Sequence, residues 1–169
     1  MAATTKPIPD GFHTATPYLT VRDAAKAIEF YQRAFGAAER GRLPMPDGKV
    51  GHAELMIGNS IVMMADEFPD YGSHSPQTLN GTTVGLALYV EDVDAAFARA
   101  VAAGATIKEP VTDKFWGDRS GTLMDPFGHR WMLLTHREDV SLEEMKNRMA
   151  KMFAAGAGQK KDACSDAKP

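Results

Sequence analysis

The sequence predicts an α+β protein with two tandem β-α-β-β-β modules, which form a concave mixed sheet around a cavity, plus a C-terminal helix. The first observation is an internal repeat, because Val21-Arg22-Asp23 recurs as Val90-Glu91-Asp92 at an offset of 69 residues (90 − 21 = 69). The second is that strand and helix patterns follow each other in the same order in both copies. A repeat this long that occurs twice indicates a duplicated module rather than a solenoid. Two copies of one unit can enclose a shared cavity, where ligands commonly bind.

The composition is that of an ordinary globular protein, with 169 residues, 44% hydrophobic and 24% charged residues and a net charge of −3. This length corresponds to one domain-equivalent and is sufficient to bury a core. Without a basic stripe or a run of 18 apolar residues, we expect neither a nucleic-acid partner nor a membrane span. The first residues lack the apolar segment of a secretory signal, and the single cysteine, Cys164, excludes an intramolecular disulfide. We therefore expect a cytoplasmic protein.

The first module is expected at residues 14–66, after a Pro-rich N-terminal arm at 1–13. Asp23 is expected to cap a helix with apolar residues on one face, and Gly36 is expected to end it in the left-handed conformation. A tight turn at Gly58-Asn59 predicts a hairpin between the module's last two strands. The expected strands are Thr14–Thr20, Ala38–Leu43, Val50–Ile57 and Ser60–Ala65.

Residues 67–81 are rich in Pro, Gly, Ser and Asn and are expected to join the modules as a loop. A loop of this length is often a functional lid over a cavity, and the alternative is a plain linker. The second module, at residues 82–136, repeats the order of the first. Its expected elements are a strand at Thr83–Val90, a helix from Asp92 to about Ala103, and strands at Thr106–Val111, Arg119–Met124 and Arg130–Thr135.

A third helix is expected at residues 141–153, because Ser141-Leu142-Glu143-Glu144 forms a capping box. Met145, Met149 and Met152 form an apolar stripe on this helix. The stripe favours packing against its own domain or against a dimer partner. An alternative is a regulatory or interaction module that works through the Met-rich helix. Residues 154–169 are small and charged and are expected to form a flexible tail.

The paired modules carry a resemblance to a known family over about Thr14 to His136. The motifs that agree best are Ile28-Glu29-Phe30-Tyr31 before Phe35-Gly36, and Asp125-Pro126-Phe127-Gly128-His129 before Trp131. They resemble the vicinal oxygen chelate superfamily, which includes glyoxalase I, bleomycin-resistance proteins, fosfomycin-resistance enzymes and extradiol dioxygenases. The stretch 114–118 (Lys-Phe-Trp-Gly-Asp) is similar to a phosphonate-metabolism-protein-like or demethylubiquinone methyltransferase-like subgroup. The resemblance implies a homodimer, since the superfamily commonly dimerises, but the fold hosts many activities.

In metal-using members of this superfamily, four His or Glu ligands come from four strands, two in each module. Carried over by strand position, they fall at Thr16, Met63, Gly85 and Met132, and the offset of 69 is kept (85 − 16 and 132 − 63). None of the four is a good ligand, because Met is soft and neutral, Gly has no side chain and a Thr hydroxyl is weak. The resemblance therefore implies the metal-free branch, with no cofactor, in which the cavity sequesters a small molecule as bleomycin-resistance proteins do.

His52 and Glu54 are expected on the concave face, because Ala53 and Leu55 between and beside them fit the helix side. Two titratable groups on one cavity face are candidates for catalysis, ligand orientation or a displaced divalent-metal site. The simpler alternative is a hydrogen-bonded polar pair at a strand edge. A convincing metal site needs at least three protein ligands, and His74 from the loop is one candidate for the third. A metal-dependent lyase, isomerase or dioxygenase is therefore the alternative function.

The second module is expected to supply aromatic area and charge to the cavity. Trp116 can stack on a planar ligand or cap the core, and Arg119 can supply charge or form an exposed ion pair with Asp118. His129 is interpreted as a solvated turn residue, and His136 as part of no functional cluster. The predicted ligand cavity is lined by Thr16, Tyr18, His52, Glu54, Met63, Tyr89, Trp116, Arg119 and Met132.

Overall fold

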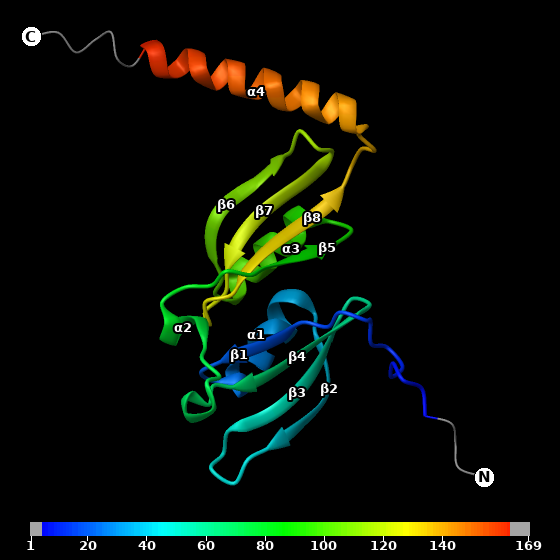
Figure 1. The fold of residues 1–169 in the computed structure, drawn as a ribbon, viewed down its shortest axis with the longest axis vertical. Coiled ribbons are helices and arrows are strands. Elements are labelled where there is room, and N and C mark those ends of the chain that lie inside the picture. The colour runs from blue at the N-terminus through cyan, green and yellow to red at the C-terminus, as the bar shows by residue number, and fades with distance from the viewer. Residues whose placement is uncertain (1–4, 163–169) are drawn as a thin grey trace, which may run out of the picture.

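The computed structural model describes residues 5–162 and contains two four-stranded mixed sheets, which confirms the α+β class (Figure 1). The strand orders are β1-β4-β3-β2 and β5-β8-β7-β6, so the two modules have the same topology. In each module the first strand pairs in parallel with the last, and the other pairs are antiparallel. The strands are β1 (Tyr18–Val21), β2 (Ala38–Pro44), β3 (Val50–Ile57), β4 (Ser60–Asp66), β5 (Gly85–Tyr89), β6 (Thr106–Asp113), β7 (Asp118–Met124) and β8 (Arg130–His136). The helices are α1 (Ala24–Phe35), the 3-10 turn η1 (Pro69–Tyr71), α2 (Pro76–Leu79), α3 (Val93–Ala103) and α4 (Leu142–Asp162).

The predicted ends of α1 and α3 are confirmed by their caps. Asp23 accepts a hydrogen bond from the Lys26 amide before α1, and Asp92 plays the same part before α3. Gly36 and Gly104 follow the two helices in the left-handed conformation, which glycine adopts without steric cost. The same capping residues, repeated at the predicted offset, therefore define the ends of both helices.

A second pair of contacts shows that the duplication extends to buried hydrogen bonds. The Ala24 amide at the start of α1 donates to Asp66 Oδ1 over 2.9 Å, and the Val93 amide at the start of α3 donates to Thr135 Oγ1 over 2.9 Å. Both acceptors follow the offset of the repeat (93 − 24 = 135 − 66 = 69). In each module, the last strand therefore holds the first turn of the covering helix.

The modules are joined by packing of α1 against α3 and by a buried aromatic cluster around Asp125. Asp125 Oδ2 accepts from Tyr31 Oη over 2.6 Å and from Trp131 Nε1 over 2.9 Å, while Oδ1 accepts from the Phe127 and His129 amides. The cluster consists of Phe30, Tyr31, Phe35, Phe127 and Trp131. One carboxylate therefore links a helix of the first module to a turn and a strand of the second.

The first strand of each module is shorter than predicted. β1 begins at Tyr18 instead of Thr14, because Pro17 lacks the N–H needed to continue a strand ladder. β5 begins at Gly85 rather than Thr83. As a result, Thr16 lies before the strand, where its hydroxyl donates to the His13 carbonyl over 3.0 Å.

α4 projects away from both sheets (Figure 1). Its predicted cap is confirmed, since Ser141 Oγ accepts from the Glu144 amide over 3.2 Å. The helix continues to Asp162, so residues 154–162 of the predicted tail are helical, because Ala, Lys and Gln around the two glycines favour a helix. The rest of that tail, including Cys164, lies outside the described residues. Within residues 5–162, the structure has no helix with the length and apolarity needed to cross a membrane.

Candidate functional site

Side-chain alternation places two different surfaces on each sheet, as predicted. The helix-facing set is buried or partly buried and comprises Leu19, Val21, Val62, Met64, Leu86, Leu88, Trp131 and Leu133. The opposite, concave face carries Tyr18 beside Met63 on the first sheet and Met132 on the second. Tyr18 and Tyr89 remain 50% and 62% exposed, so large aromatic surfaces are accessible there. The predicted strand register is therefore confirmed.

His52 and Glu54 lie on the concave face of the first sheet and form a polar network with Tyr18. Tyr18 Oη lies 3.1 Å from His52 Nδ1, and His52 Nε2 lies 3.6 Å from Glu54 Oε1. Arg40, which the sequence did not single out, donates from Nη1 to Glu54 Oε2 over 3.3 Å. Burial raises the pKa of Tyr18, so its phenol is neutral at physiological pH. These contacts orient the imidazole ring and pair the carboxylate with a guanidinium.

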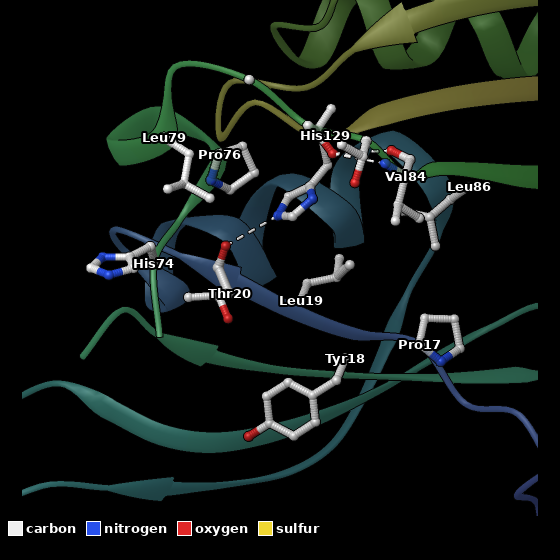
Figure 2. Close-up of a pocket in the computed structure, with 13 residues that line it drawn as sticks. Pro17, Tyr18, Leu19, Thr20, His74, Pro76, Leu79, Val84, Leu86 and His129 are labelled. Carbon is white, nitrogen blue, oxygen red and sulfur yellow. Dashed lines mark hydrogen bonds between the residues drawn. The ribbon is translucent and has the colours of Figure 1, made fainter. Parts of the chain in front are cut away.

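A cavity of about 740 Å³ lies between the free edge of β1 and the chain that leads into β5 (Figure 2). Tyr18 and Thr20 line one side, while Leu79 and Val84 line the other. Four residues from the second half of the loop at 67–81 thus form part of the wall of this cavity. Leucine, valine and proline side chains give the cavity mostly apolar walls.

His129 also lines this cavity, so its interpretation as a solvated turn residue is wrong. The ring is nearly buried, with 9% of the residue exposed, and Nε2 lies 3.2 Å from the Thr20 carbonyl (Figure 2). The cause is Asp125, which fixes the turn and holds the His129 backbone so that the ring reaches the edge of β1. His74 lines the same cavity, and its Nδ1 is buried without a hydrogen-bond partner among the residues described.

The loop at 67–81 is fastened to the body by Glu67, the first residue after β4. Its carboxylate accepts from Thr78 Oγ1 over 2.5 Å, from the Ser75 amide over 2.9 Å and from Arg22 Nε over 3.2 Å. These bonds, the one from Thr78 foremost, lower the pKa of Glu67 from 4.5 to about 2. Because α2 contains Thr78, the charge of Glu67 holds the wall of the cavity in place.

Acidification is expected to release this loop. A depressed pKa contributes stability that is complete above pH 4.5 and is lost as the pH falls through about 2. We therefore expect the protection of amides in residues 67–81, taken relative to the intrinsic exchange rate at each pH, to fall between about pH 4.5 and 2, and to fall less in Glu67→Gln, which cannot titrate. Hydrogen exchange at several pH values measures this. An equal acid response in both proteins would contradict the assignment.

The second sheet carries a polar cluster that the sequence did not predict. Asp118, 5% exposed at the start of β7, accepts at Oδ2 from Tyr89 Oη over 3.1 Å and from Trp116 Nε1 over 3.0 Å. His136 Nδ1 lies 2.8 Å from Asp118 Oδ1, and His136 Nε2 lies 3.0 Å from Asp139 Oδ1. His136, which the sequence places in no cluster, is therefore the centre of this one.

Arg119 lies on the helix side of the second sheet rather than in the predicted cavity. Its guanidinium bonds to Asp94 in the first turn of α3 over 2.7 and 2.8 Å, and to Asp113 over 3.1 Å. Gly121 and Leu123 share this face, and a Cβ at Gly121 would overlap Phe97 of α3. Arg119 therefore pairs with Asp94 and Asp113 instead of Asp118.

Comparison with known proteins agrees with this geometry. The sequence pattern of the Glyoxalase/Bleomycin resistance protein/Dioxygenase superfamily matches residues 12–133. The chain belongs to this superfamily. An uncharacterized protein of Mycobacterium bovis, Mb0911c, is 46% identical over 138 residues, which cover 80% of this chain and 91% of that protein.

Two solved structures of the superfamily fold show the same likeness. TioX from Micromonospora sp. ML1 is 30% identical, with a TM-score of 0.58 over 76% of this chain and 100% of that one. PhnB protein from Bacillus cereus is 20% identical, with a TM-score of 0.56 over 73% of this chain and 99% of that one, and shows the fold alone. The resemblance inferred from the sequence motifs is therefore confirmed.

The four positions that correspond to the metal ligands of metal-using superfamily members do not fit a divalent cation here. Thr16 uses its hydroxyl on a neighbouring carbonyl, and Met63 and Met132 are soft, neutral donors. At Gly85, a Cβ would lie 3.1 Å from Arg130 Nε, so a guanidinium occupies the space where a ligand side chain would extend. Within residues 5–162, no group of three or more His, Cys, Asp or Glu is arranged to hold a metal ion.

The nine residues predicted to line one ligand cavity lie in separate places in the structure. Tyr18, His52 and Glu54 form the network on the first sheet, with Met63 beside Tyr18. Tyr89 and Trp116 belong to the Asp118 cluster at the end of the second sheet. The remaining three are Thr16 before β1, Met132 on the concave face of β8 and Arg119 on the helix side.

Proposed function

We propose that this superfamily member binds a small molecule without the usual metal centre and acts by sequestering it. The observation that carries the proposal is the set of residues at the four metal positions, Thr16, Met63, Gly85 and Met132, of which Gly85 is covered by a guanidinium. A cation placed there would face soft or absent donors and a positive charge. Polarisation of a substrate by a metal at that centre, on which metal-using members depend, therefore lacks its ligands.

The cavity beside β1 supports ligand binding by its size and its walls. Its volume of about 740 Å³ lies within the range of roughly 300–1,000 Å³ that small-molecule sites usually have. Leu19, Leu79 and Leu86 offer apolar contact, while His129 and His74 bring two imidazole rings to its lining. Such walls suit a largely apolar ligand with one or two polar groups.

We further propose a cytoplasmic homodimer. Large apolar side chains remain exposed on the concave faces and on α4, and such exposed surface commonly marks an interface. The exposed set comprises Tyr18, Leu43, Tyr89, Leu142, Met149, Met152 and Phe153. A second copy that covered these faces would enclose both polar networks and bring the separate groups of predicted cavity residues closer together. It would also give the Met-rich stripe of α4 a surface to pack against. This favours a packing role for the stripe over a separate regulatory function.

The alternative function is a metal-dependent lyase, isomerase or dioxygenase with a displaced site at His52 and Glu54. Their distance of 3.6 Å supports it. Two contacts oppose it, because Tyr18 Oη already meets His52 Nδ1 and Arg40 pairs with Glu54. A cation would have to displace the guanidinium before it could use that carboxylate.

Native mass spectrometry of protein exposed to Zn, Ni, Mn and Fe and then desalted tests both parts of the proposal, since one spectrum reports mass and metal content. We expect the mass of a dimer, far less than one metal per chain, and added mass when apolar candidate ligands are screened. Near one metal per chain, lost in His52→Ala and kept in the exposed control His13→Ala, would overturn sequestration in favour of the enzyme. A monomer mass at micromolar concentration would overturn the dimer.

A further inference from the structure

A second recess, of about 460 Å³, lies where the end of the second sheet meets the start of α4. Tyr89, Trp116 and Met145 form its aromatic and apolar walls, and His136 and Asp139 supply its charged groups. It shares no lining residue with the cavity of about 740 Å³. The inference drawn from it therefore does not depend on ligand binding in that cavity.

Asp118 holds His136 in one orientation at this recess. The carboxylate is almost fully buried, and its two oxygens already accept three hydrogen bonds, from Tyr89, Trp116 and His136. These three donors therefore occupy most of the acceptor capacity of Asp118. Its effect is to fix the proton of His136 on Nδ1 and to direct Nε2 toward the recess.

Asp139 is the only group that meets the outward nitrogen of His136 among the residues the structure describes. Both ring nitrogens face carboxylate oxygens, at 2.8 and 3.0 Å. Only an imidazolium, which carries a proton on each nitrogen, can donate a hydrogen bond to both. The hydrogen bonds that His136 donates to Asp118 and then to Asp139 raise its pKa accordingly. The side chain of Asp139 is fully exposed, so its ion pair is weak and readily exchanged.

We propose that this recess binds the carboxylate of a small planar acid, and that Asp139 occupies the place of that carboxylate when no ligand is bound. A ligand carboxylate would accept the Nε2–H of His136, and its planar body would lie against Trp116 and Tyr89. Exchange of one exposed carboxylate for another leaves the charge on His136 satisfied. The aromatic contact, which Asp139 cannot make, then favours the ligand.

The outward Nε2–H of the His136 imidazolium favours an anion over a cation once Asp139 has moved aside. The charge of Asp118 from β7 is balanced by that imidazolium, and its other two donors, the Trp116 indole and the phenol of Tyr89 from β5, are neutral. Asp139 comes from the segment after β8, while the recess-lining residues of α4 and its cap, Met145 and Ser141, are uncharged. The recess also lies at the N-terminus of α4, whose dipole presents its positive end there. Glu144 in the first turn is paired with Arg148.

Benzoate, with benzamide and benzylamine as neutral and cationic counterparts, tests the proposal by NMR on the full chain. We expect benzoate to shift the Trp116 indole N–H and the His136 ring signals, and benzamide and benzylamine to shift them far less. His136→Gln should weaken benzoate binding about tenfold, the loss of one hydrogen bond to a charged group. Asp139→Asn should strengthen it several-fold, while the control Asp70→Asn, which removes an exposed charge elsewhere, should not.

The pH dependence supplies a second readout that a merely structural His136 would not change. Benzoate binding should decline as the pH rises through the pKa of His136, which lies above the ordinary 6.5, and His136→Gln should remove that decline. Benzylamine binding more tightly than benzoate, no benzoate binding at millimolar concentration, or weaker binding in Asp139→Asn would each overturn the proposal. The NMR spectrum of His136→Gln also shows whether the variant is folded, so a loss of benzoate binding can be separated from unfolding.

Discussion

Asp125→Ala is expected to lower the free energy of unfolding by about 4 kcal/mol, because the substitution removes the acceptor for several buried donors at once. Tyr31 Oη and Trp131 Nε1 would lose their partner at Oδ2, and the Phe127 and His129 amides would lose theirs at Oδ1. Each buried donor left unpaired costs about 1–3 kcal/mol, and water would reach some of them. Urea denaturation followed by circular dichroism measures the loss.

Tyr31→Phe is the matched control, since it removes a single donor from the same carboxylate and leaves the aromatic ring in place. We expect it to cost about 1 kcal/mol, well below the alanine variant. Asp125→Asn should fall between them, because the amide oxygen still accepts but the amide nitrogen faces the donors Tyr31 and Trp131. A loss in Asp125→Ala no larger than that in Tyr31→Phe would show that one carboxylate does not hold the modules together.

Much of the fold follows from local sequence, because each of the duplicated modules contains the capping residues that begin and end its helix. Asp23 and Gly36 bound α1 as the cap rules predict, and the repeat transfers the same rules to α3. Strand faces follow from alternation, which is why His52 and Glu54 were correctly placed on the concave face. Both kinds of signal depend on neighbours in the sequence and need no tertiary information.

The cluster around His136 was missed because its members meet only through strand pairing. The β7–β8 hairpin pairs Met124 with Arg130, and continued extension of that register pairs Asp118 with His136 (124 + 130 = 118 + 136). That arithmetic could have linked the two from the sequence. Tyr89 could not have been added in this way, because its parallel pairing with β8 is set by the fold of the whole module.

The prediction that Arg119 lines the cavity is wrong, and strand alternation explains why. Leu123, four residues later on the strand, is a core residue, so Arg119 must share its helix-facing side. Trp116, Asp118 and Arg119 are close in sequence but do not form one group. Trp116 lies in the turn before β7, and Asp118 and Arg119 point to opposite faces. His129 differs, because its burial depends on a contact with β1 far away in sequence, which no local pattern shows.

Gly117→Ala is expected to detach the segment at 137–141, and α4 with it, from the end of the second sheet. Gly117 adopts φ +100°, a conformation that costs alanine about 1–2 kcal/mol. A Cβ there would also overlap the Glu138 carbonyl and lie 2.9 Å from Val140 Cγ2. Gly117 O accepts the Arg137 and Glu138 amides over 2.9 and 3.0 Å, so the bonds that fasten the segment are the ones placed under strain.

The release should be local, because residues 137–139 are exposed and can move, whereas the turn before β7 is held by Asp118 and Trp116. We expect faster amide exchange at Arg137 and Glu138 and faster tryptic cleavage after Arg137, with both sheets intact by circular dichroism. Gly41→Ala is the control, since its Cβ would meet nothing within 4 Å. In this variant Asp139 would also move away from His136. Exchange and cleavage rates equal to those of the wild type would mean that Gly117 does not set the position of the second recess.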